Sequence, residues 1–173
     1  DRRGVRALVD IYVRFHKEAE SDPSLEDTAR AWFKRIEDGD KEAVEIFDRF
    51  KKSTMAEVSR IYDRLHVTFD SYAGESFYND KMDAVLSKMD GKGLLEEDGG
   101  AKIVRLGDDM PPCLLVRSDG ATLYATRDLA AAYYRKATYD FDKCLYVVAY
   151  QQNLHFRQLF KVLELAGEPW HKD

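Results

Sequence analysis

The chain has 173 residues, of which 45% are hydrophobic and 34% are charged, and its net charge is −5. This composition is typical of a folded globular protein with one main core and excludes a disordered chain. No apolar run approaches the roughly 20 residues that span a bilayer. The negative net charge argues against binding of a nucleic-acid backbone by these residues alone. Cys113 and Cys144 lack metal-site spacing, so we expect reduced thiols in a cytoplasmic protein.

The first third of the chain has helical periodicity. Apolar residues fall at three- and four-residue steps in residues 5–20, then in a second helix closed near Gly39, and in a third over residues 41–65. We expect an interruption near Ser53 and Thr54, because Thr54 and Glu57 have the spacing of a capping box. Residues 1–65 are therefore predicted to form a helical segment packed on a core that residues 66–173 form.

The helical periodicity ends after Leu65. Residues 66–73 alternate like a strand that runs into a loop, and a helix closed by Gly91 or Gly93 follows. Inserted hairpins are predicted over about residues 92–125, with turns at residues 98–100 and 118–120.

The last part predicts a helix over 127–137, a strand in "KCLYVVAY" and a helix over 154–165. The continuous apolar run of that strand is typical of a parallel sheet covered on both faces. The fold class is therefore predicted to be α/β, because the order helix, buried strand, helix is typical of a doubly wound domain. Ligands in such folds collect at the carboxyl ends of strands, which places Tyr150, Gln151, Gln152 and His155 on the ligand rim.

Two interpretations of Asp128 are open at this point. Thr126 could cap the helix and put Asp128 in the first turn, where the helix dipole favours a carboxylate. Alternatively, Asp128 and Tyr124 could bind a planar cation. A guanidinium needs a carboxylate for a bidentate pair, a second acceptor and an aromatic wall, and Asp128, Glu75 and Tyr124 would supply these groups if the fold brings them together.

The stretches "LYATRD", "QQNLHF" and "VTFDSYAGESFYNDKM" closely resemble the bacterial arginyl-tRNA synthetases, which are class I aminoacyl-tRNA synthetases. The resemblance covers essentially the whole chain. It implies part of a Rossmann-like catalytic domain, with a helical N-terminal layer and a small hairpin insertion. It also implies an enzyme that activates arginine with ATP and Mg²⁺ and charges tRNA(Arg).

The resemblance assigns roles to single residues. Tyr124, Asp128 and Glu75 match the family's contacts to the substrate guanidinium. Gln152 matches the glutamine that helps to hold the amino end of arginine, and His155 matches a histidine near the nucleotide side. No residue of this chain is expected to act as a catalytic nucleophile or as a metal ligand.

The chain also departs from the family. Ala149 and Tyr150 stand where many members have other residues, which affects the geometry of the rim. The His-x-Gly-His and Lys-Met-Ser-Lys signatures that serve ATP are missing, so we expect a central piece of the catalytic domain that is inactive by itself. A non-catalytic binding module derived from the synthetase fold is the alternative, an unrelated α/β domain is a third reading, and the residues do not indicate an oligomeric state.

Overall fold

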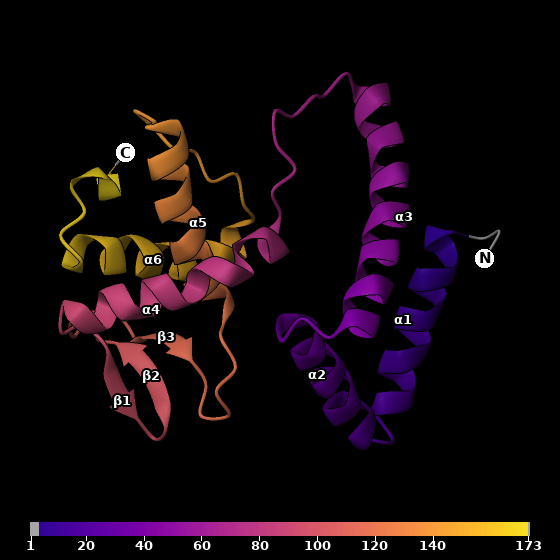
Figure 1. Cartoon of the computed structure of the whole chain (residues 1–173), viewed down its shortest axis with the longest axis horizontal. Coiled ribbons are helices and arrows are strands. Elements are labelled where there is room, and N and C mark those ends of the chain that lie inside the picture. Colours follow the sequence, from indigo (N-terminus) through magenta and orange to yellow (C-terminus); the bar gives the residue numbers. More distant parts are fainter. Residues whose placement is uncertain (1–3, 173) are drawn as a thin grey trace. The chain divides into compact units, whose positions relative to one another are not determined.

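The computed structural model describes residues 4–172. The chain divides into two compact units, one that ends at Tyr72 and one that begins at Ala73 (Figure 1).

The first unit consists of three helices, α1 (Val5–Ala19), α2 (Ser24–Glu37) and α3 (Lys41–Leu65). They pack on one another through small side chains, and Ala7, Ala19 and Ala43 are buried. Asp40 caps α3, because its carboxylate accepts a hydrogen bond of 3.0 Å from the backbone N–H of Ala43. The expected interruption near Ser53 is wrong: α3 is continuous until His66 ends it in a left-handed conformation.

The strand expected over residues 66–73 is also absent. The backbone from Val67 to Gly74 has no regular structure. Phe69 packs edge-on against Tyr62 and Tyr72, with ring centroids 4.8 and 5.6 Å apart. An alternating pattern makes a strand only where a partner accepts its backbone hydrogen bonds, and no described strand pairs with this segment.

The second unit combines helices with a small sheet. Its helical elements are η1 (Glu75–Lys81), α4 (Met82–Gly91), α5 (Tyr124–Tyr139), η2 (Tyr150–Gln152), α6 (Asn153–Leu165) and η3 (Pro169–Lys172). Its strands are β1 (Glu96–Asp98), β2 (Ala101–Val104) and β3 (Cys113–Val116), which form an antiparallel sheet in the order β1-β2-β3.

The first predicted hairpin is confirmed. Gly99 and Gly100 both have positive φ angles and connect β1 to β2 at the predicted turn. The second predicted hairpin is shorter than expected, because after the turn at Gly120 only a single bridge joins Val116 to Thr122.

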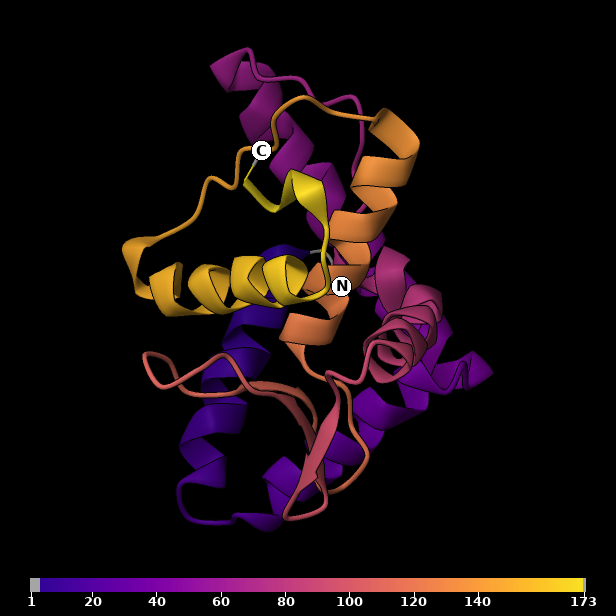
Figure 2. The ribbon, with the colours of Figure 1, turned by 90° about the vertical axis from the view of Figure 1, so that its left-hand side faces the viewer.

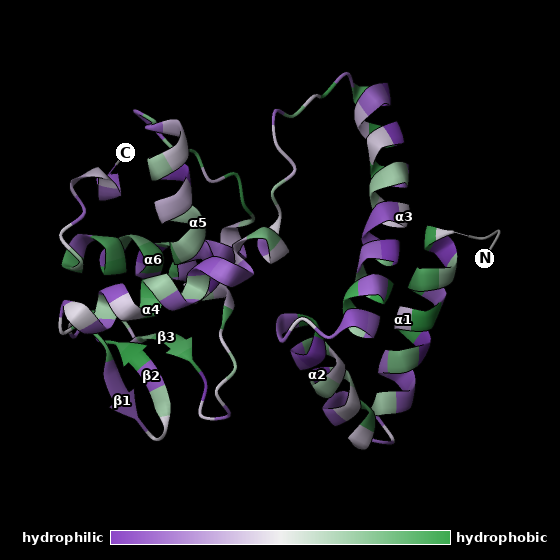
Figure 3. Ribbon diagram, in the orientation of Figure 1, coloured by the Kyte–Doolittle hydropathy of each residue, from purple (hydrophilic) through white to green (hydrophobic). Residues whose placement is uncertain are grey.

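The core of this unit lies around α5, which contacts α4, α6 and β3 (Figures 1 and 2). Large side chains from all these elements are fully buried, among them Met89, Leu115, Leu129, Leu159 and Leu163. Three consecutive small residues, Ala130 to Ala132, keep α5 slim enough for its neighbours to approach. Figure 3 shows that β2 and β3 are mostly hydrophobic, whereas β1 is hydrophilic.

The buried strand expected in "KCLYVVAY" is not formed in this structure. Residues 143–149 run without regular structure and, among the described residues, no parallel sheet exists. Cys144 and Tyr146 face inward, where Tyr146 packs on Phe156 at 4.9 Å, whereas Leu145 is 78% and Val147 94% exposed. The segment thus has one packed side, and no described strand lies beside it to complete a sheet.

Candidate functional site

The site begins at the N-terminus of α5. This helix starts at Tyr124, three residues earlier than predicted. The residue before it, Leu123, has an extended backbone, and its side chain makes no capping hydrogen bond. The predicted capping role of Thr126 is wrong: its buried hydroxyl donates a 2.6 Å hydrogen bond to the carbonyl oxygen of Leu115 and ties α5 to β3. Asp128 is therefore the fifth residue of the helix, beyond the turn where the dipole favours acids.

Tyr124 and Asp128 lie one turn apart on the same side of α5, as residues four apart on a helix do. His155, in the first turn of α6, contacts both. Its Nε2 lies 2.7 Å from Oδ2 of Asp128, and its ring meets that of Tyr124 edge-on with centroids 4.8 Å apart. Three of the five residues singled out in the sequence thus form one cluster, and the contact with His155 gives Asp128 a role that capping does not explain.

Glu75 opens η1 and reaches the same helix from another side. Its Oε2 lies 3.5 Å from Nη1 of Arg127, the residue before Asp128, and its side chain is 78% exposed. The Nε of Arg127 donates a 3.1 Å hydrogen bond to Oδ1 of Asn79, also in η1. Sequence reasoning missed the contribution of Arg127 and Asn79, although Arg127 stands inside the quoted motif "LYATRD".

Gln152 lies at the end of η2, immediately before α6. Its side chain is exposed, and within the described part of the chain no hydrogen bond joins it to Tyr124, Asp128, His155 or Glu75. It nevertheless shares the N-terminal end of α6 with His155, three residues further on. Ala149 and Tyr150, the departures from the family pattern, are exposed at this same end.

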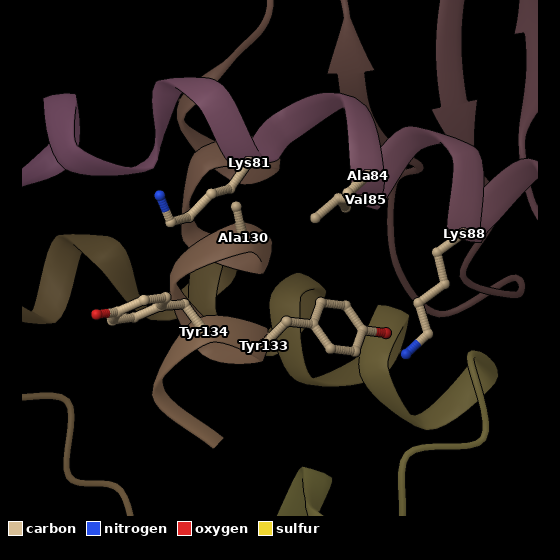
Figure 4. A pocket seen from close by; sticks show the side chains of 7 residues that line it. All are labelled: Lys81, Ala84, Val85, Lys88, Ala130, Tyr133 and Tyr134. Carbon is tan, nitrogen blue, oxygen red and sulfur yellow. The ribbon is translucent and has the colours of Figure 1, made fainter. Parts of the chain in front are cut away.

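A separate cavity of about 320 Å³ lies between α4 and α5 and shares no residue with this cluster. Figure 4 shows Lys81 and Lys88 at its two ends, with Tyr133 and Tyr134 of α5 along one side. The Nζ of Lys88 lies 4.0 Å from the Tyr133 ring centroid and 2.7 Å from Oε1 of Glu168. Burial, together with nearby Glu168, raises the pKa of Tyr133. These lysines already have partners, so the cavity is part of the packing of the unit.

The described residues contain no group of three or more histidine, cysteine, aspartate or glutamate side chains that could hold a metal ion. Burial raises the pKa of Cys113 to about 11, so this thiol is protonated at neutral pH. In the part of the chain that the structure covers, no helix has the length and apolarity to cross a membrane.

Known proteins are similar to this chain over almost its whole length. Residues 2–172 match the family model described as "tRNA synthetases class I (R), catalytic domain". The arginine–tRNA ligases of Clostridium acetobutylicum and Clostridium perfringens are 56% and 57% identical over 170 residues, which is 98% of this chain and 30% of each relative. The chain thus spans about 30% of the length of these curated relatives.

Solved structures share the fold. The arginyl-tRNA synthetase from Plasmodium falciparum matches with a TM-score of 0.74 at 24% identity, over 86% of this chain and 26% of that chain. A putative arginyl-tRNA synthetase from Campylobacter jejuni matches with a TM-score of 0.65 at 17% identity, over 76% of this chain and 29% of that chain. The chain belongs to the catalytic-domain family of the arginine-type class I tRNA synthetases.

Proposed function

We propose that this chain supplies the arginine-reading part of the catalytic domain of an arginine–tRNA ligase. The complete enzyme would join arginine to ATP as an adenylate, release pyrophosphate and transfer the arginyl group to tRNA(Arg). The observation that carries the proposal is the cluster of Tyr124, Asp128 and His155, with Glu75 on the neighbouring segment. It lies in a chain more than half identical to arginine–tRNA ligases.

Each side chain has a chemical task in this proposal. The carboxylate of Asp128 pairs with the substrate guanidinium, the phenol of Tyr124 flanks that group, and exposed Glu75 supplies a second acceptor. His155 holds Asp128 in place, in addition to the expected role on the nucleotide side. Gln152 binds the amino end of arginine and thereby turns the substrate carboxylate toward the nucleotide.

None of these residues forms a covalent bond with the substrate during the reaction. The chain contributes by positioning arginine, which can account for a large share of the barrier reduction in such transfers. ATP enters as a substrate with Mg²⁺, and the residues that bind its phosphates and the tRNA belong to other parts of the enzyme. Neither His-x-Gly-His nor Lys-Met-Ser-Lys occurs in this chain.

We also propose that residues 143–149 form a strand of a Rossmann-like sheet in the complete domain. The support is the alternation of burial along the segment, with Tyr146 packed on α6 and Leu145 and Val147 open to solvent. Pairing would satisfy the backbone groups and place Gln152 at the carboxyl end of a strand, where ligands bind in such sheets.

The test of the proposed function is arginine-dependent exchange between ATP and pyrophosphate. We expect exchange by the complete synthetase that carries this chain, and none by residues 1–173 alone, because the residues for ATP are missing. Exchange above blank by the isolated chain, in a preparation free of host synthetase, would contradict the proposal that other parts of the enzyme bind ATP. Absence of arginine-dependent exchange in the complete protein, both with and without added tRNA(Arg), would instead favour a non-catalytic binding module.

A further inference from the structure

Arg127 is the one charged residue of the "LYATRD" motif to which the proposed function gives no task. It is only 7% exposed, although a guanidinium stays charged at any pH that a folded protein tolerates. Removing such a charge from water is costly unless well-placed partners compensate for it. The partners of Arg127 should therefore show what its burial achieves.

Two of these partners lie in η1, about fifty residues earlier in the chain. The Nε of Arg127 donates a 3.1 Å hydrogen bond to Oδ1 of half-buried Asn79. Its Nη1 lies 3.5 Å from Oε2 of Glu75, well beyond the 2.7–2.9 Å of a strong charge-assisted bond. Of these two contacts, the one with Asn79 is the shorter and the one with Glu75 is loose.

The geometry of α5 separates Arg127 from its neighbour Asp128. Successive residues on a helix point about 100° apart. Accordingly, Arg127 contacts η1, whereas Asp128 contacts His155 of α6. Arg127 is thus one of the contacts that join α5 to η1, beside the packing of Phe77 and Tyr78 on Tyr134.

We propose that Arg127 is a positioning residue that acts through Asn79: the pair fixes η1 on α5 and so places Glu75 for the substrate guanidinium. This inference rests on the proposed function, because it assumes that Glu75 reads arginine. Since the 3.5 Å contact is loose and Glu75 is exposed, its carboxylate can turn to a ligand while Arg127 stays bonded to Asn79. Arg127 itself does not touch the substrate.

The experiment measures the KM for arginine and for ATP in the exchange reaction of the complete synthetase. Asn79→Leu removes the Oδ1 acceptor that Asn79 offers to Arg127, and it should raise the KM for arginine about tenfold, with the KM for ATP and kcat within about twofold. Asn79→Asp restores an acceptor, and its KM for arginine should return to within about twofold of the wild-type value. Equal KM values for arginine in the wild type and in Asn79→Leu would overturn the proposal.

Lys136 provides a control on the same helix that does not contact η1. It is a half-buried cation, whose Nζ donates a 2.8 Å hydrogen bond to the carbonyl oxygen of Phe141 and lies 3.1 Å from Oδ1 of Asp140. Lys136→Met should lower the melting temperature and leave the KM for arginine unchanged, whereas Arg127→Met should change both. If Arg127→Met does not fold, the comparison of the two Asn79 variants still decides the question.

The double variant Glu75→Gln/Asn79→Leu separates positioning from a general loss of stability. If Asn79 acts through Glu75, the double variant should have a KM for arginine no higher than the worse single variant. Multiplied single effects would overturn the positioning role. An unchanged KM in Glu75→Gln would show that Glu75 does not read arginine, and the proposal would fail with it. A raised KM in Glu75→Gln beside a normal KM in Asn79→Leu would refute positioning alone.

Discussion

At the residue scale, Asp128 has a different environment from the one that a position in the first helical turn would give it. It lies beyond the first turn of α5, and its partner is the imidazole of His155 at 2.7 Å. A carboxylate in the first turn would instead be stabilised by the free backbone N–H groups at the helix start. The position of Asp128 therefore favours a role in binding over a role in helix stability.

Asp128→Asn keeps the shape of the side chain and removes its charge. A desolvated ion pair that loses one partner costs about 3–5 kcal/mol, because the other charge is left without compensation. In the complete synthetase we expect kcat/KM for arginine to fall about a hundredfold or more, with the melting temperature nearly unchanged. Asp140→Asn, at the exposed C-terminal end of the same helix, is the control and should leave the kinetics unaltered. A lowered melting temperature with normal kinetics in Asp128→Asn would return this residue to a structural role.

At the element scale, α5 is the part on which the other elements depend. Its first turn is attached to β3 through Thr126, its small residues admit α4 and α6, and Arg127 donates a hydrogen bond to Asn79 of η1. A displacement of α5 would therefore move Tyr124 and Asp128, together with the segments that pack on it.

Thr126→Val tests the attachment of α5 to β3. Valine has nearly the same shape but leaves the buried carbonyl oxygen of Leu115 without its 2.6 Å hydrogen bond. Such a loss costs about 1–3 kcal/mol of unfolding free energy. Thr28→Val is the matched control, because the Thr28 hydroxyl makes only an exposed hydrogen bond to the Ser24 carbonyl and its loss should change stability by less than about 0.5 kcal/mol. Equal unfolding midpoints in denaturant for the two variants would refute the attachment.

The sequence predicts single helices and turns better than it predicts contacts between residues that are far apart in the chain. Periodicity located α1, α2 and α6, and the glycines located the turn between β1 and β2. The start of α5 was misplaced because Leu123 has no capping side chain that could mark it. The residues proposed to bind arginine could be named from the resemblance, but the bond from Arg127 to Asn79 could not, because it joins residues 48 positions apart.

At the scale of the whole molecule, the open question is the extended segment of residues 143–149. The apolar side chains of Leu145 and Val147 are both exposed to solvent here. Neighbouring exposed apolar side chains often mark a surface that another element covers. The sequence predicted a buried strand, yet a strand needs a neighbour, and that neighbour is not among the described residues.

Hydrogen exchange of the backbone amides tests the proposed pairing. In the complete synthetase, the amides of residues 145–148 should exchange at least about a hundredfold more slowly than in residues 1–173 alone, because sheet hydrogen bonds must open first. The amides in the middle of α6 serve as the reference and should be protected in both. Rapid exchange of residues 145–148 in both proteins would show that no strand forms.

The claim that the cluster around Asp128 reads a guanidinium is tested most directly by calorimetric titration of the complete synthetase with arginine and with citrulline. Citrulline has nearly the same shape, but its neutral ureido group cannot form the charge-assisted pair. The account predicts that arginine binds at least about a hundredfold more tightly than citrulline and that Asp128→Asn removes most of this difference. Equal affinities for the two ligands, or an undiminished preference for arginine in Asp128→Asn, would contradict it.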